Sequence, residues 1–347
     1  MAMTPRERVI AAMNKENLDR PPVAIFTQSA TVGQMDKTGA AWPEAHKNAE
    51  IMAKLAAAQA TVFGFECCRT SFCLTAEAER LGCKVAVVKK DAAPMIKSHP
   101  FKFDCMAGEY DSPDALMPVE DFMKEGRVAE VAKSCTILKK DMGKDYVIVA
   151  GTTGPFTLAG HMVSTENLIF GMMMAPEQVD KWVQAVTPIC KVYAQSLIDA
   201  GADVIQMSEP SASTDMIAPD MFQEAAGKAV KDSLGSTHGD IGNVLHICGD
   251  TYPILDQMVT CGAKGISIEE KVDPFKAVEK VGSKTVLVGN VGSVKPLFQG
   301  TVDEVKQGVL NSCNAGFDII SSGCGIAPST SDANMQMMVD TVKAFKR

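Results

Sequence analysis

Eight short apolar segments recur along this chain, and most of them are separated by longer segments with the periodicity of a helix. The predicted strands span residues 23–26, 61–65, 146–150, 203–208, 244–248, 265–269, 285–290 and 317–322. Near-continuous apolar strands that alternate with helices indicate a parallel sheet covered on both faces. Eight such units predict an α/β protein with a closed (β/α)8 TIM barrel. An open, doubly wound sheet is the structural alternative.

Two helix starts carry a capping box, in which a threonine side chain and a glutamate three residues later satisfy free amide groups. Thr4 with Glu7 predicts an N-terminal helical extension, and Thr301 with Glu304 predicts a later helix. The segment around 67–145 is long for one crossover and predicts an insertion with a short strand near 84–88 and a helix beginning near Asp114. Without a repeat or a low-complexity linker, we expect residues 1–347 to form a single domain.

Charge and hydropathy exclude several classes of function. The net charge is −8, and the basic residues are spread along the chain, so we expect no nucleic-acid partner. No run of about 18 uncharged apolar residues occurs, and the N-terminus lacks the apolar centre of a signal peptide. We therefore expect no membrane partner and a cytoplasmic location. The eleven cysteines are odd in number, so most are predicted to be buried small side chains in a reducing compartment.

The segment HICGD places His246 and Cys248 at the end of a predicted strand. Because they are two residues apart, their side chains project to the same face, at the barrel end where active sites form. Cys324 follows another predicted strand, in SSGCG, and is expected at the same rim. One imidazole and two thiolates suit a Zn²⁺ site that keeps one coordination position open. A half-buried histidine beside a core thiol is the alternative explanation of the same pattern.

Other polar residues also end predicted strands. Glu269 is a candidate fourth, displaceable ligand, or an acceptor that holds the imidazole, although a rim carboxylate facing water explains it nearly as well. Gln28, Ser208 and Asn290 are candidate contacts to a small substrate, and ordinary loop caps would look the same.

Four segments of the chain resemble the uroporphyrinogen decarboxylase superfamily. They read TPRERVIAAMNKENLDRPPV at 4–23, GTTGPFTLAG at 151–160, VGNVGSVKPLFQGTVDEVK at 288–306 and SSGCGIAPSTSDANMQMMVDTVKAF at 321–345. Within the superfamily the chain is most similar to the methylcobamide:coenzyme M methyltransferases of methane-forming archaea. That resemblance implies a zinc site formed by an H-x-C motif and a distant cysteine, here His246, Cys248 and Cys324.

The chain departs from the decarboxylases of the superfamily at three places. Those enzymes carry arginines after the first strand, whereas this chain reads IFTQSATVGQMD, and RTSFCLTAE lacks their catalytic aspartate. Cys324 stands where they have a glycine-flanked histidine. The substrate clamp and the acid of decarboxylation are therefore missing.

The resemblance implies transfer of a methyl group from a methyl-Co(III) corrinoid, carried on a small partner protein, to the thiol of coenzyme M. Such enzymes serve methanogenesis from methanol or methylamines and use Zn²⁺. Methyl transfer to another thiol, such as homocysteine, is one alternative. A non-catalytic module that binds zinc or a corrinoid protein is another.

Overall fold

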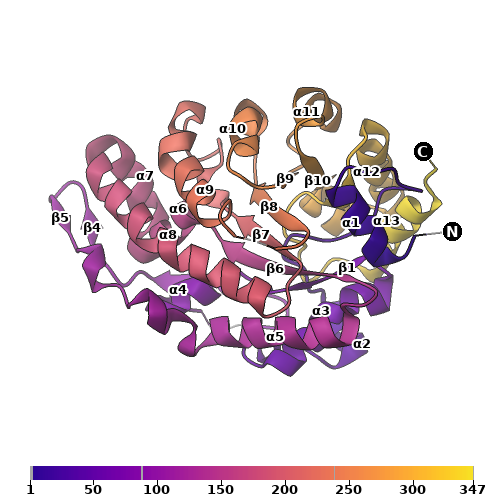
Figure 1. The fold of residues 1–347 in the computed structure, drawn as a ribbon, viewed down its shortest axis with the longest axis horizontal. Helices are drawn as coiled ribbons and strands as arrows, with labels where there is room; N and C mark the ends of the chain where they lie inside the picture. The colour runs from indigo at the N-terminus through magenta and orange to yellow at the C-terminus, as the bar shows by residue number, and fades with distance from the viewer. Residues whose placement is uncertain (1–2, 87–88, 238, 347) are drawn as a thin grey trace.

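A parallel sheet of seven strands forms the centre of the computed structural model, which describes residues 3–86, 89–237 and 239–346 (Figure 1). The strands lie in the order β1-β6-β7-β8-β9-β10-β11, so each one pairs with its neighbour along the barrel. They are β1 (Cys67–Thr70), β6 (Val147–Thr153), β7 (Val204–Ser208), β8 (Gly242–Ile247), β9 (Gly265–Ile268), β10 (Val286–Val291) and β11 (Ile319–Ser322).

The segment 22–26 closes the sheet into a ring. Val23 forms a parallel bridge with Ile320 of β11, and its carbonyl accepts a hydrogen bond of 2.8 Å from the Glu66 amide, just before β1. The Ile320 amide donates in turn to the carbonyl of Pro22 at 2.9 Å. The predicted TIM-barrel architecture is confirmed, with one bridge in place of a full strand at 23–26.

The predicted strand at 61–65 is wrong. Gln59–Phe63 form a π-helix that continues α3 (Ala49–Ala58), and Gly64 ends it with a φ of 82°. The first paired strand begins later, at Cys67. An apolar run of five residues does not distinguish a strand from a buried helix, and here the alanine-rich segment before it extends the helix.

Helices surround the sheet on its outer side (Figure 1). Those after β6 and β7 are α6 (Pro155–Val163), α7 (Thr165–Met174), α8 (Pro176–Asp199) and α9 (Lys228–Ser233). Those after β8, β9, β10 and β11 are α10 (Leu255–Val259), α11 (Pro274–Val281), α12 (Val302–Ala315) and α13 (Asp332–Ala344). α2 (Val32–Thr38) and α3 follow the closing segment. Among the helices of the described residues, none has the length and apolar character needed to cross a membrane.

The N-terminal helix α1 (Pro5–Met13) begins at the predicted capping box, with Thr4 and Glu7 bonded reciprocally. Its Val9, Ala12 and Met13 are buried with inward-facing strand residues such as Val147 and Val204. The N-terminal helical extension is thus confirmed, and it covers the end of the barrel at which the strands begin. The second predicted capping box, at the start of α12, is also present.

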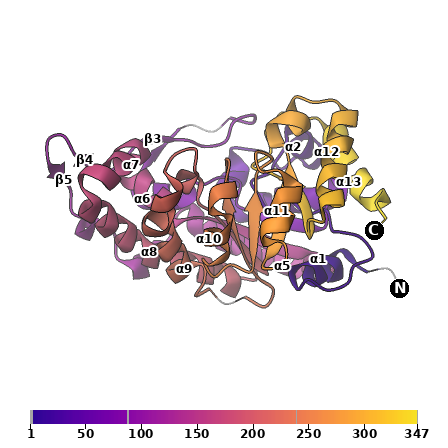
Figure 2. The same ribbon diagram turned by 90° about the horizontal axis from the view of Figure 1, so that it is seen from above.

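The predicted insertion lies between β1 and β6. It contains α4 (Ala76–Arg80), the antiparallel pair β2 (Lys84–Val85) and β3 (Ile96–Ser98), the pair β4 (Phe103–Asp104) and β5 (Glu109–Tyr110), and α5 (Arg127–Met142). The predicted strand near 84–88 is confirmed at Lys84–Val85, while residues 87 and 88 lie outside the described residues. The helix expected near Asp114 is only a 3-10 turn, Pro113–Ala115, and the α-helix starts at Arg127. Figure 2 shows the β4–β5 pair projecting beyond α7, far from the chain termini.

The residues that face the barrel interior are apolar near the starts of the strands and polar further along them. Val204 and Val244, near the strand starts, belong to the apolar core inside the barrel. Two residues further along each strand, Gln206 and His246 are also fully or almost fully buried. Buried polar side chains require partners, so this end of the barrel is where a site can be assembled.

Candidate metal centre

His246 is held on β8 by the neighbouring strand. Its register partner on β9 is Ser267, whose carbonyl and hydroxyl oxygens lie 3.2 and 3.0 Å from the imidazole Nδ1. A proton on Nδ1, donated to Ser267, leaves the lone pair on Nε2. That Nε2 atom is buried and has no hydrogen-bond partner among the described residues. The imidazole is therefore fixed in the tautomer and orientation that a metal ligand needs.

Cys248 follows β8 and Cys324 follows β11, and their Sγ atoms lie 3.7 Å apart. The hydrogen bond that they share raises the pKa of Cys248 and lowers that of Cys324, because two adjacent thiolates repel and the pair keeps one proton. The turn after Cys248 requires Gly249, whose φ is 82° and whose missing Cβ would lie 2.3 Å from the Ser213 hydroxyl.

The donor atoms of His246, Cys248 and Cys324 all lie within 4.8 Å of one another. The structure thus brings together the three residues that the sequence singled out. One imidazole nitrogen and two sulfurs are the donor set of three-ligand zinc sites, and the unpartnered Nε2 together with the close sulfur pair fits such an ion.

Glu269 lies just after β9, and its Oε2 accepts a hydrogen bond of 2.5 Å from the Gly249 amide. Its carboxylate is not part of the three-residue donor cluster found in the described part of the chain. Ser267, rather than Glu269, holds the imidazole. In this structure the Glu269 carboxylate fixes the backbone that follows Cys248.

The three candidate substrate contacts differ in their surroundings. Gln28 lines a cavity, and its Nε2 is buried without a hydrogen-bond partner among the described residues. Ser208 is buried at the end of β7 and accepts a hydrogen bond from Gln206. The Asn290 amide is already used: it donates to the Val272 carbonyl at 2.8 Å and accepts from the Ser312 hydroxyl at 3.0 Å. Gln28 is the one of the three best placed to contact a substrate.

Two supporting residues were missed in the sequence. Ser267 was one, although a serine within the otherwise apolar GISI strand is itself a signal of a polar partner. Thr27 was the other: its hydroxyl lies 2.8 Å from the Cys324 carbonyl, within hydrogen-bond distance. Nothing in the local sequence links Thr27 to a residue 297 positions away.

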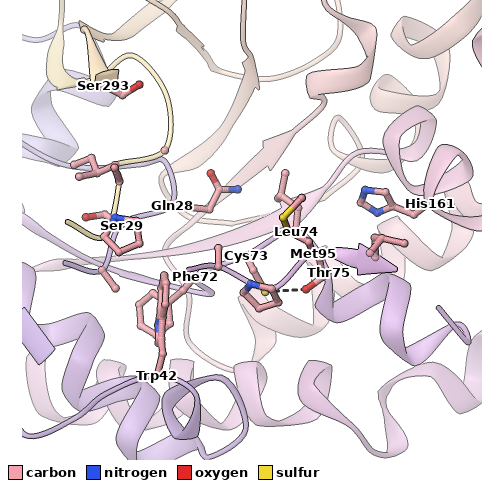
Figure 3. Close-up of a pocket in the computed structure, with 18 of the residues that line it drawn as sticks. Gln28, Ser29, Trp42, Phe72, Cys73, Leu74, Thr75, Met95, His161 and Ser293 are labelled. Atoms are coloured by element: carbon pink, nitrogen blue, oxygen red, sulfur yellow. Dashed lines mark hydrogen bonds between the residues drawn. The ribbon is translucent and has the colours of Figure 1, made fainter. Parts of the chain in front are cut away.

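A cavity of about 580 Å³ extends from this rim of the barrel (Figure 3). Its wall includes Gly325 and Ile326, which directly follow Cys324, as well as the aromatic rings of Trp42 and Phe72. Ala93 to Ile96, from the insertion, line it too. The three donor residues are not among those that line the cavity, but Gly325 and Ile326 join its wall to Cys324, and the cavity has room for a molecule larger than a metal ion.

The family model of uroporphyrinogen decarboxylase (URO-D) matches residues 4–345. The chain belongs to the uroporphyrinogen decarboxylase family. Relatives that share about a third of its residues over nearly its whole length are named for methyl transfer, not for decarboxylation. The methylcobamide:CoM methyltransferase MtbA of Methanosarcina acetivorans is 35% identical, with 99% of this chain and 98% of the relative covered. The methylcobamide:CoM methyltransferase MtaA of Methanosarcina barkeri is 33% identical over 97% of this chain and 96% of its own length.

A solved structure of a methyltransferase from Methanosarcina mazei shares the fold with a TM-score of 0.90 and 34% identity, and 98% of each chain is covered. Within the uroporphyrinogen decarboxylase family, these relatives confirm the prediction that this chain is a methyltransferase.

Proposed function

We propose that this family member transfers a methyl group from a methyl-Co(III) corrinoid, carried on a small partner protein, to the thiol of coenzyme M at a Zn²⁺ ion held by His246, Cys248 and Cys324. The observation that carries the proposal is the convergence of these three donors within 4.8 Å. Relatives whose names state transfer from methylcobamide to CoM support the choice of donor and acceptor.

The chemistry requires a nucleophilic sulfur. A free thiol has a pKa of about 8.5 and is mostly protonated at neutral pH. Zn²⁺ bound here would supply a positive charge that makes an acceptor thiol lose its proton. The acceptor sulfur then forms a bond to the methyl carbon, while the cobalt–carbon bond breaks and its electron pair stays on cobalt.

The chain's own residues position this reaction. Ser267 fixes the His246 ring through Nδ1, so that Nε2 faces the two cysteine sulfurs. Thr27 tethers the Cys324 backbone, and Glu269 tethers the backbone next to Cys248. We propose that Gln28 orients the acceptor from the cavity wall. We also propose that Glu269, whose carboxylate bonds the Gly249 amide and lies outside the donor cluster in this structure, would turn toward a bound ion and serve as a displaceable fourth ligand. Ser208 belongs to the supporting network rather than to this contact, since Gln206 already donates to its hydroxyl.

The test supplies the purified, zinc-loaded protein with free methylcob(III)alamin and coenzyme M, and follows corrinoid absorbance together with the methylated product. We expect methyl-coenzyme M and cob(I)alamin, and a far slower reaction with homocysteine, which lacks the sulfonate. Cys324→Ala is expected to abolish the reaction, whereas Cys105→Ala, a half-buried cysteine in the insertion, is the matched control. Equal rates with and without zinc would overturn the proposal.

A further inference from the structure

A second sulfur centre lies on the wall of the cavity, away from the three metal-ligand candidates. Cys73 follows β1 and is 6% exposed, and it lines the cavity together with Thr75, Phe72 and Gln28 (Figure 3). The metal centre and its ligands do not account for this residue.

Two directed hydrogen bonds reach the Cys73 sulfur. Nη1 of Arg127 donates to Sγ at 3.1 Å, and the Thr75 hydroxyl donates at 3.3 Å. Arg127 also donates from Nη2 to the Thr75 hydroxyl at 2.9 Å, which leaves the Thr75 hydrogen directed at the sulfur. A neutral thiol is a weak acceptor, so a buried sulfur with a guanidinium and a hydroxyl both aimed at it has the surroundings of a thiolate.

His46 lies beside the same sulfur, and its ring is tilted against that of Trp42, with the ring centroids 4.7 Å apart. Its Nε2 is buried and has no hydrogen-bond partner of standard geometry among the described residues. Burial raises the pKa of the Cys73 thiol, but His46, Arg127 and Thr75 outweigh burial and lower this pKa to about 5.

Other charged or titratable groups near the sulfur come from the elements packed around it. They are Arg69 of β1, Glu77 of α4, Tyr193 of α8 and, beyond Arg127, its ion-pair partner Glu79. Burial lowers the pKa of Arg69 to about 10 and raises the pKa of Glu77 to about 7. Glu79 pairs with Nε of Arg127, whereas Nη1 contacts Cys73 Sγ. The Arg127 guanidinium therefore remains the cation in direct contact with the sulfur.

The cavity wall around Cys73 also carries polar atoms that await a ligand. The Ser29 hydroxyl, 2% exposed, has no hydrogen-bond partner among the described residues, and the same holds for Gln28 Nε2. Both residues line the cavity together with Cys73. A buried polar group without a partner is unfavourable, and a bound molecule with complementary groups would relieve that cost.

We propose that Cys73 is a thiolate nucleophile on the cavity wall and a site of covalent modification by small alkylating molecules that enter the cavity. In this reaction a lone pair on Sγ attacks a carbon that carries a leaving group. The sulfur–carbon bond forms, the bond to the leaving group breaks, and the leaving group departs with the electron pair. No proton has to be removed, because Arg127 and Thr75 already stabilise the anion. This inference is independent of the proposed methyl transfer.

The experiment measures alkylation of the purified full-length protein by iodoacetamide, with each modified cysteine assigned by peptide mass spectrometry. Between pH 6 and 8 we expect the Cys73 rate to be almost constant. The rate of N-acetylcysteine, the reference thiol, should fall about tenfold per pH unit across this range, because an ordinary thiol has a pKa above about 8 and is mostly protonated here. Cys73→Ser is expected to remove the labelled peptide.

A matched pair of arginine variants tests the source of the reactivity. In Arg127→Gln the Cys73 rate at pH 6 should fall at least fivefold relative to pH 8. Arg80→Gln removes a guanidinium of the same insertion, which donates to the carbonyls of Phe122 and Asp121 and pairs with Glu125, and it should keep the flat profile. If Arg127→Gln does not fold, the wild-type profile decides alone. A wild-type Cys73 rate that falls in parallel with N-acetylcysteine, or no labelling of Cys73 at pH 6, would overturn the proposal.

Discussion

Ser267 presents two oxygen atoms to one nitrogen of His246, with its carbonyl 3.2 Å and its hydroxyl 3.0 Å from Nδ1. The two residues are register partners on adjacent strands, so the sheet itself sets this distance. Residues that orient a histidine ligand through its second nitrogen typically change metal affinity by about 10- to 100-fold when mutated. The relationship makes Ser267 the supporting residue whose replacement is most informative.

Ser267→Ala is expected to weaken zinc affinity by about tenfold, the lower end of that range, because the carbonyl remains as an acceptor. Competition with a chromophoric chelator measures the change. Ser321→Ala, another buried serine on a barrel strand, is the control and should leave zinc affinity within about twofold. Unchanged affinity in Ser267→Ala would show that the imidazole is oriented by other contacts.

Replacing any one of His246, Cys248 and Cys324 with alanine should remove most of the zinc and leave the fold largely intact. Each of these variants lacks one of the three converging donors, and a site with two donors binds zinc weakly. Metal analysis after gel filtration measures occupancy, with far-ultraviolet circular dichroism as the check on folding. Full zinc occupancy in Cys324→Ala would place the metal elsewhere.

Acid should weaken the contact between the N-terminal helix and the barrel at Asp203. Burial raises the pKa of Asp203, but hydrogen bonds from Arg6 and Lys139 outweigh it and lower this pKa below its ordinary value. A lowered pKa stabilises the folded state at pH values above the unfolded pKa of about 3.9, and this stabilisation is lost as pH falls through the lower folded pKa.

Asp203→Asn should therefore reduce the free energy of unfolding by about 2–3 kcal/mol at pH 7, since it breaks a pair whose carboxylate is buried while its cations are partly exposed. The difference from the wild type should shrink toward pH 3. Urea denaturation at pH 7 and at pH 3 measures this difference in the free energy of unfolding. The control is Asp141→Asn, which replaces an exposed aspartate on α5 and should change the free energy of unfolding by less than about 0.5 kcal/mol. A difference that does not depend on pH would contradict the assignment.

Most of the barrel could be predicted from the sequence. Both faces of each barrel strand are buried, so the strands appear in the sequence as nearly continuous apolar runs. The error at 61–65 arose because five apolar residues fit a π-helix as well as a strand, and only the preceding Ala49–Ala58 helix decides between them. His246, Cys248 and Cys324 could be identified because each has a side chain of metal-binding type and lies near or just after the end of a strand.

Contacts between distant segments could not be predicted in the same way. Asn290 ends its strand like the other candidates, yet its amide is bonded to Ser312 and to the Val272 carbonyl. The thiolate surroundings of Cys73 depend on Arg127, which lies 54 residues away in an insertion whose course the sequence does not indicate.

Zinc K-edge X-ray absorption before and after addition of coenzyme M tests the central claim most directly. The resting protein should show two sulfur neighbours, one imidazole nitrogen and a light oxygen ligand, for which Glu269 is the proposed source. Coenzyme M should replace that oxygen with a third sulfur. A zinc spectrum that lacks two sulfur neighbours, or one that coenzyme M leaves unchanged, would contradict the account.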